Sequence, residues 1–262
     1  MTYNDLEFFK HWFYEYTKSF YSSIEEDQRN IILKVEHTQH VCENIVKIAR
    51  SLSLSDNKTW MAETIALFHD LGRFPQYARY RTFRDADSMN HGLLGARTLI
   101  KENVLHNLTG KEQEIIINAV RFHNAFRIPS VLNNDTILFL QLIRDADKVD
   151  IYRVFIEYYA SPEEERASAT AFGVPDTPEC SREMISSILK GQIASYSHIK
   201  TENDFKIMKL SWLYDMHFDE SIRLLKDRNC INKIIDQLPR TEEINSAVVQ
   251  LSRYIEKRLK KD

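Results

Sequence analysis

Helical periodicity runs through almost the whole chain, and few residues interrupt it. The 262 residues include only 6 Gly and 6 Pro, the residue types that most often break regular elements. Apolar residues recur at helical spacing, and no sustained alternation of apolar and polar residues marks a strand. The sequence therefore predicts an all-α fold. We expect helices at about residues 3–21, 25–52, 57–71, 88–104, 111–125, 134–160, 180–196, 202–228, 230–238 and 241–260.

The chain offers one good candidate for a linker. Residues 161–179 hold three of the six prolines, and proline-rich segments separate helices rather than form them. We expect residues 1–160 to form a core with an N-terminal helix. Residues 161–262 are expected to form a helical extension packed on the same domain. Residues 72–87, rich in arginine and aromatic side chains, are expected to form a loop.

Composition excludes several classes of partner. The net charge of −3 provides no basic field for nucleic acid or for an anionic membrane. The three cysteines form no CxxC pair, which suits a reducing compartment. The N-terminus lacks the apolar core of a signal peptide, and no apolar run has transmembrane length. We therefore expect a cytoplasmic protein. The amphipathic C-terminal stretch is expected either to cover a site or to form the face of a homodimer.

A histidine lies on the apolar face of the second predicted helix. His37 shares a helical stripe with Val41, Ile45 and Ile48, whereas His40 falls on a more polar face. An imidazole on an apolar face needs a polar partner, because burying it alone costs free energy. His37 is therefore either a hydrogen-bonded core histidine or a metal ligand.

The dipeptide His69-Asp70 follows the apolar segment WMAETIALF and precedes Leu71-Gly72. A carboxylate at the C-terminus of a helix opposes the helix dipole, and a bound cation would offset that cost. The two oxygens of Asp70 could also bridge two ions. This dipeptide is therefore a candidate for the centre of a metal site.

Three further residues are candidate metal ligands. His91 opens a segment with Gly92 and Gly95, which allow close approach of another helix, and it is either a capping residue or a ligand. His123 follows an apolar helical face and has the same two interpretations as His37. Asp147 lies in an apolar stripe of helix 134–160, where an acid is costly unless it binds a cation or a base. Asp145 and Asp150 lie off that stripe and are expected to be solvated or to support ligands.

The order His, His-Asp, His, His, Asp resembles that of the HD-domain superfamily of metal-dependent phosphohydrolases. The strings HTQHV, LFHDLGRF, NHGLLGA, FHN and IRDADKVD resemble its core motifs and cover about residues 31–155. The resemblance implies an HD-domain helical bundle with additional C-terminal helices. It also implies that His37, His69, Asp70 and Asp147 bind one metal ion, and that Asp70, His91 and His123 bind a second. The GYP tripeptide of the cyclic-di-GMP phosphodiesterases and the basic tracts of the HD nucleases are absent.

The chemistry follows from this implied ligand set. Imidazole and carboxylate ligands suit one or two divalent transition ions, namely Mn, Fe, Co, Ni or Zn. We expect a metal-activated hydroxide to attack a small phosphorylated substrate, with a nucleotide as the favoured class. Asp70 would be catalytic as the bridging ligand. Arg73 and Lys148 would stabilise the negative charge that develops on the phosphate or on the leaving group.

Two other functions remain open from the sequence. Some proteins of the HD fold carry a diiron centre on a similar ligand set and are oxygenases. A nucleotide-sensing protein without catalysis is a further alternative, although decayed sites tend to lose their ligands. The arginine-rich segment after Asp70 favours the hydrolase.

Overall fold

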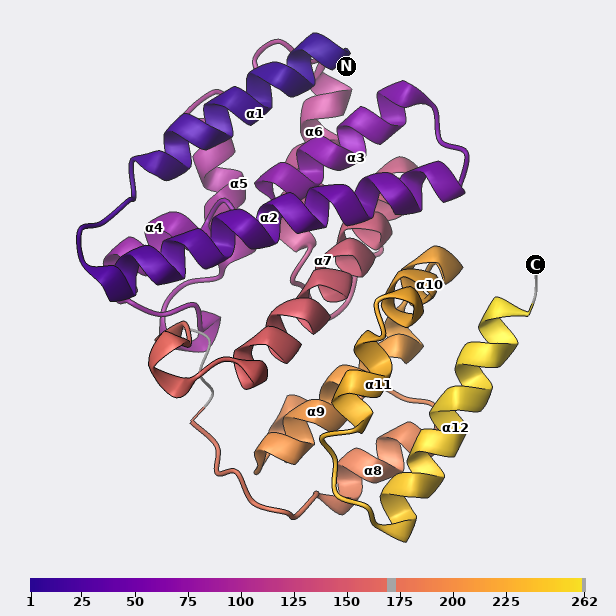
Figure 1. The fold of residues 1–262 in the computed structure, drawn as a ribbon. Helices are drawn as coiled ribbons and strands as arrows, with labels where there is room; N and C mark the ends of the chain where they lie inside the picture. Colours follow the sequence, from indigo (N-terminus) through magenta and orange to yellow (C-terminus); the bar gives the residue numbers. More distant parts are fainter. Residues whose placement is uncertain (169–172, 261–262) are drawn as a thin grey trace. The chain divides into compact units, whose positions relative to one another are not determined.

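The computed structural model describes residues 1–168 and 173–260, and within these residues it contains helices and no strand. The predicted all-α class is confirmed (Figure 1). In chain order the helices are α1 (Tyr3–Lys18), α2 (Glu25–Ser51), α3 (Asp56–Phe68), α4 (Arg73–Tyr80), α5 (His91–Lys101), α6 (Gly110–Phe122), α7 (Asn134–Ala160), α8 (Arg182–Leu189), α9 (Glu202–Ser211), α10 (Asp219–Asp227), α11 (Cys230–Ile235) and α12 (Glu242–Leu259). Short 3-10 helices are η1 (Asp85–Asp87), η2 (Glu163–Glu165), η4 (Tyr196–His198) and η5 (Trp212–Asp215). None of the described helices combines the length and apolar character that a membrane crossing requires.

The chain divides into two compact units. The first comprises Met1–Ile151 with Ser161–Ala171, and the second comprises Tyr152–Ala160 with Phe172–Asp262. The division runs through α7. It also runs through the predicted linker 161–179, of which residues 169–172 lie outside the described part of the chain.

Helix α3 is the central element of the first unit. It packs against α1, α2 and α6, and Figure 1 shows α1 and α2 as its neighbours. Residues Met61 to Phe68 of this helix are buried, except for Glu63. A helix that is apolar on nearly all sides is stable only inside a core. The His69-Asp70 dipeptide at its C-terminal end is therefore placed deep in the unit.

Two glycines allow the helices around that dipeptide to approach closely. A Cβ atom on Gly72 would lie 2.1 Å from the carbonyl oxygen of His91. A Cβ atom on Gly92 would lie 2.8 Å from the carbonyl oxygen of Arg121. Both contacts are too short for any other residue. The close approach expected at Gly92 is confirmed, and it brings α5 against α6 next to His91.

In the second unit, α9 is buried on all sides from Asn203 to Ser211. Its first turn contains Asp204, which is 0% exposed. The Asp204 carboxylate accepts hydrogen bonds from the backbone N–H and the hydroxyl of Ser181, and from the backbone N–H groups of Lys200 and Thr201. Helix α8 packs on α9 and on α12.

Three predicted segments differ from the structure. The predicted helix 180–196 ends early, since α8 stops at Leu189 and Gly191 adopts a left-handed φ of 67°. The predicted loop 72–87 contains α4, which ends where Arg81 adopts a left-handed φ of 55°. The predicted single helix 202–228 is instead α9, followed directly by η5, and then α10. Extended backbone at Met216 and Phe218 separates η5 from α10. Neither glycine nor proline marks that break, so helical apolar spacing continues across it in the sequence.

Candidate metal centre

The six residues that the sequence singled out lie together in the first unit. They come from α2, from the residues after α3, from the first position of α5, from the residue after α6, and from α7. Five are nearly inaccessible, and the Asp147 side chain is 21% exposed. These six residues are His37, His69, Asp70, His91, His123 and Asp147.

Each carboxylate oxygen of Asp70 faces one pair of histidines. Its Oδ2 atom lies 3.7 Å from Nε2 of His37 and 3.7 Å from Nε2 of His69. Its Oδ1 atom lies 3.4 Å from Nε2 of His91 and 3.9 Å from Nε2 of His123. The donor atoms therefore form two groups that share Asp70, each compact enough to hold a metal ion. We call His37, His69 and Asp70 group one, and Asp70, His91 and His123 group two.

Asp147 lies beside group one. Its Oδ1 atom is 3.1 Å from Nε2 of His37 and 3.8 Å from Nε2 of His69. A fourth ligand from α7 would thus complete a set of two imidazoles and two carboxylates at this position. Such a mixed nitrogen and oxygen set suits a divalent transition ion.

Backbone carbonyl groups orient two of the imidazoles. Nδ1 of His69 lies 2.7 Å from the oxygen of Ala66, and Nδ1 of His123 lies 2.7 Å from the oxygen of Val120. A carbonyl oxygen only accepts hydrogen bonds, so each Nδ1 must carry the proton. In the neutral ring, Nε2 then presents its lone pair to the centre.

Carboxylates orient the other two imidazoles. Nδ1 of His37 lies 2.7 Å from Asp150, and Nδ1 of His91 lies 2.8 Å from Asp85. All four Nδ1 atoms therefore serve as donors, and all four Nε2 atoms point at Asp70. Carboxylate–histidine pairs of this kind fix ring orientation in metal sites.

Two features of the Nε2 atoms indicate that the centre can bind a cation. The Nε2 atom of His69 is buried and has no hydrogen-bond partner. The Nε2 atoms of His91 and His123 lie 3.0 Å apart. With both Nδ1 atoms protonated, two lone pairs face each other across that distance, which is repulsive unless a cation lies beside them. The residues present therefore fit the metal ions that the sequence pattern implies.

The pKa values of the histidines differ between the groups. Burial, aided by Arg73, lowers the pKa of His91 to about 4, and burial with the nearby His69 lowers the pKa of His123 to about 4. Burial also lowers the pKa of His69. Burial alone would lower the pKa of His37, but hydrogen bonds to Asp147 and Asp150 raise it to about 9. Without metal, the two histidines of group two are therefore neutral at pH 7, whereas His37 holds an additional proton.

Basic side chains reach the shared carboxylate. Nζ of Lys34 lies 2.8 Å from Oδ2 of Asp70, and Nε of Arg73 lies 3.4 Å from Oδ1. Burial would raise the pKa of Asp70, but Lys34, His69 and Arg73 hold it well below its usual range. Lys148 follows Asp147 on α7 and is partly buried. Its role remains a prediction.

Sequence reasoning missed Lys34 and Asp85, and it placed Asp150 only as one of two alternatives. Asp145 and Asp150 are both fully buried, so the solvated alternative is wrong for both. The supporting role is confirmed for Asp150, which lies one helical turn after Asp147. Lys34 lies one turn before His37 on α2, and that spacing was an available signal. Asp85 lies in the predicted loop, where no periodicity marks it.

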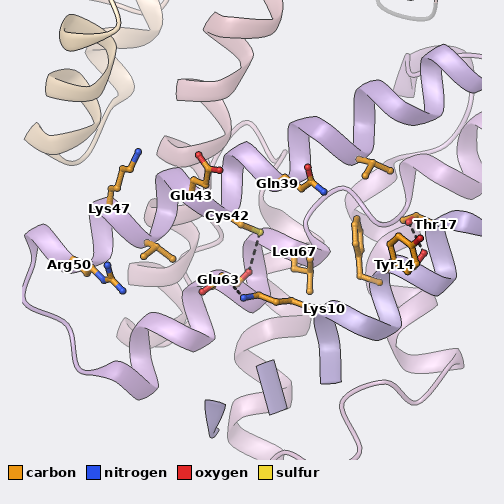
Figure 2. Close-up of a pocket in the computed structure, with 13 residues that line it drawn as sticks. Lys10, Tyr14, Thr17, Gln39, Cys42, Glu43, Lys47, Arg50, Glu63 and Leu67 are labelled. Carbon is orange, nitrogen blue, oxygen red and sulfur yellow. Dashed lines mark hydrogen bonds and ion pairs between the residues drawn. The ribbon is translucent and has the colours of Figure 1, made fainter. Parts of the chain in front are cut away.

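Other polar sites stay apart from the centre. His40 is exposed and lies 3.8 Å from Glu43, as expected from its polar helix face. A groove of about 600 Å³ opens on another face of α2, between α1 and α3 (Figure 2). Cys42 in this groove donates a hydrogen bond to the carbonyl of Glu63, and burial raises the pKa of its thiol. None of the six residues of the metal centre lines the groove.

Residues 35–152 match the family model of the HD domain, and this range contains all six residues of the candidate centre. No curated protein and no solved structure matches the chain.

Proposed function

Because this chain is a member of the HD-domain superfamily through residues 35–152, we propose that it is a metal-dependent phosphohydrolase. Its proposed substrate is a small phosphoester, with a nucleotide as the favoured class. Members of the superfamily are commonly metal-dependent hydrolases, and the residues of the centre described above suit that chemistry.

The convergence of four imidazole Nε2 atoms on one shared carboxylate is the observation that carries this proposal. His37, His69, Asp70 and Asp147 would hold one ion, and Asp70, His91 and His123 would hold a second. Bound transition ions such as Mn, Fe, Co, Ni or Zn supply Lewis acidity and lower the pKa of water.

The chain's own cations support a phosphate ester as the substrate. Lys34 and Arg73 place positive charge beside Asp70, and Lys148 adjoins Asp147 in the sequence. The phosphoryl oxygens of the substrate carry negative charge, and further negative charge develops on the leaving group during hydrolysis. Fixed cations stabilise both charges. We propose that Lys34 binds a phosphoryl oxygen and that Arg73 and Lys148 stabilise the leaving group.

The first experiment is elemental analysis of protein purified without added metal or chelator, combined with phosphate release from a panel of nucleotides and simple phosphoesters. We expect about two transition ions per chain and release of phosphate from at least one substrate. His37→Ala should lose metal and activity, whereas His40→Ala should keep both, because His40 is exposed and lies outside the centre.

Other outcomes would point elsewhere. Two iron ions with oxygen uptake and no hydrolysis would replace the hydrolase by the diiron oxygenase. One ion per chain would leave group two without a metal. Absence of metal after soaking with each candidate ion would refute the proposal.

A further inference from the structure

Asp85 connects three parts of the first unit through one carboxylate. It accepts hydrogen bonds from Nδ1 of His91 at 2.8 Å and from Nη1 of Arg73 at 3.0 Å. Gln76 and Asn124 each donate to it from 2.9 Å through their side-chain amides. These donors come from α4, from α5 and from the segment after α6. The orientation of His91 in group two therefore depends on a residue outside the helices that carry the ligands.

The segment that carries Asp85 has few buried apolar contacts, and most of its attachments are polar, including the ion pair of Arg81 with Asp27 at 2.6 Å. Within residues 81–90 only Phe83 is buried, and the only regular structure is the single turn η1. Phe83 packs on the Tyr77 ring, and its carbonyl accepts a hydrogen bond from Arg73. Gln76 donates to Ser88 and to the carbonyl of Met89. We call residues 81–90 the clasp segment.

The corresponding carboxylate of group one is held differently. Asp150 orients His37, is 0% exposed and lies within the long helix α7. The Asp85 side chain is 30% exposed and lies in a short turn. Segments with few buried apolar contacts open locally at lower free energy than helices in a core. The clasp segment, which orients His91 of group two, therefore opens more easily than helix α7, which orients His37 of group one.

From this difference we infer that group two is a conditional metal position, which the clasp segment assembles through Asp85. The inference rests on the proposed function, because it requires that the centre binds metal. Group one binds its ion whether or not the clasp segment is docked. The second ion binds after the first and leaves before it, so docking of the clasp segment sets the number of ions per chain. Asp85 is a positioning residue, since it acts through His91.

The test is titration of the metal-free protein with Co²⁺, followed by calorimetry and by visible absorption. Wild-type protein should bind two equivalents in two steps. Asp85→Asn keeps the size of the side chain but removes its charge, and Asp85→Ala removes the acceptor altogether. We expect the second step to weaken by about 10- to 100-fold, the usual effect of losing a group that orients a ligand. The affinity and absorption of the first step should change by less than about threefold.

Asp87→Asn is the matched control. Asp87 lies in the same turn, is exposed, and pairs with Arg84 at 3.1 Å. This variant should bind both ions as the wild type does. Equal weakening of both steps in Asp85→Asn, at unchanged helicity, would overturn the inference, and so would two unchanged steps. A wild-type protein that binds no Co²⁺ would instead refute the proposed function.

Hydrogen exchange provides a second readout that does not depend on a variant. Amides of residues 81–90 should gain protection when the second equivalent of Co²⁺ binds. Amides of α7 near Asp150 should gain theirs with the first. Protection of residues 81–90 that is complete after one equivalent would contradict the conditional position.

Discussion

Asp70 in the first unit and Asp204 in the second are both buried carboxylates, yet their neighbours differ in kind. Asp204 accepts four hydrogen bonds from uncharged donors, three of them backbone N–H groups. Asp70 instead faces the ammonium group of Lys34, the guanidinium group of Arg73 and four imidazole Nε2 atoms.

The difference teaches how to separate a structural acid from a candidate metal ligand. Burial of a carboxylate requires a partner, but it does not specify which. Three backbone N–H groups and one hydroxyl satisfy Asp204, so it shapes the start of α9. The neutral imidazoles of His69, His91 and His123 cannot donate from Nε2 to Asp70, and a cation between them could bind both the nitrogens and the carboxylate. Four experiments test this distinction, from the largest expected effect to the smallest.

Asp70→Ala should remove both metal ions and reduce activity by at least about 10³-fold, because the residue contributes an oxygen to each group. Far-ultraviolet circular dichroism should remain unchanged, and elemental analysis measures the loss of metal. An active, metal-free Asp70→Ala protein would remove the distinction between the two acids.

Acid should destabilise the metal-free protein through group two. The pKa values of His91 and His123 are about 4 in the fold and 6.5 when unfolded. Between these values the unfolded chain takes up protons that the folded chain does not, so stability present above pH 6.5 falls as the pH is lowered to about 4. The expected loss is about 3 kcal/mol for each histidine.

His37 should act in the opposite direction. Its pKa rises from 6.5 to about 9 on folding, so its contribution is present below pH 6.5 and is lost as the pH rises to about 9. Urea unfolding midpoints of chelator-treated protein between pH 4 and 9 measure both effects. We expect a maximum near pH 6.5, and a flat profile would contradict the buried neutral state of His91 and His123.

Asp204→Ala should lower the free energy of unfolding by about 1–3 kcal/mol, because it leaves buried donors without their acceptor. Metal content and activity per folded chain should remain those of the wild type. Urea unfolding with parallel elemental analysis measures both quantities. Loss of metal in this variant would show that the two carboxylates are not functionally separate.

Thr201→Ala should have the smallest effect, about 1 kcal/mol, since it removes the side-chain cap of α9 and one hydrogen bond from the hydroxyl to the Glu179 carbonyl. The variant keeps Asp204 and all four donors to its carboxylate, because Thr201 contributes only its backbone N–H to that carboxylate. A shift in the unfolding midpoint larger than that of Asp204→Ala would reverse the assigned importance of the two residues.

Sequence reasoning found the six candidate ligands, which the structure brings together, and missed part of what orients their side chains. His37, His123 and Asp147 interrupt apolar helical stripes, and periodicity reveals such residues directly. The contact between Asp85 and His91 depends instead on how a loop folds back, which no periodic pattern records. Helix α4 was missed as a whole, because residues 72–87 were predicted as a loop, and its end at Arg81 adopts a left-handed conformation that arginine rarely signals.

The spread of the six residues over the first unit gives bound metal a further consequence. An ion in group one with Asp147 would join α2, the end of α3 and α7, and an ion in group two would join α3 to α5 and α6. Such ions act as cross-links between segments that are distant in the chain. A ligand that binds only the folded protein adds about 4 kcal/mol when its free concentration is 1,000 times its dissociation constant. The supply of metal would then govern how long each molecule survives as well as how fast it works.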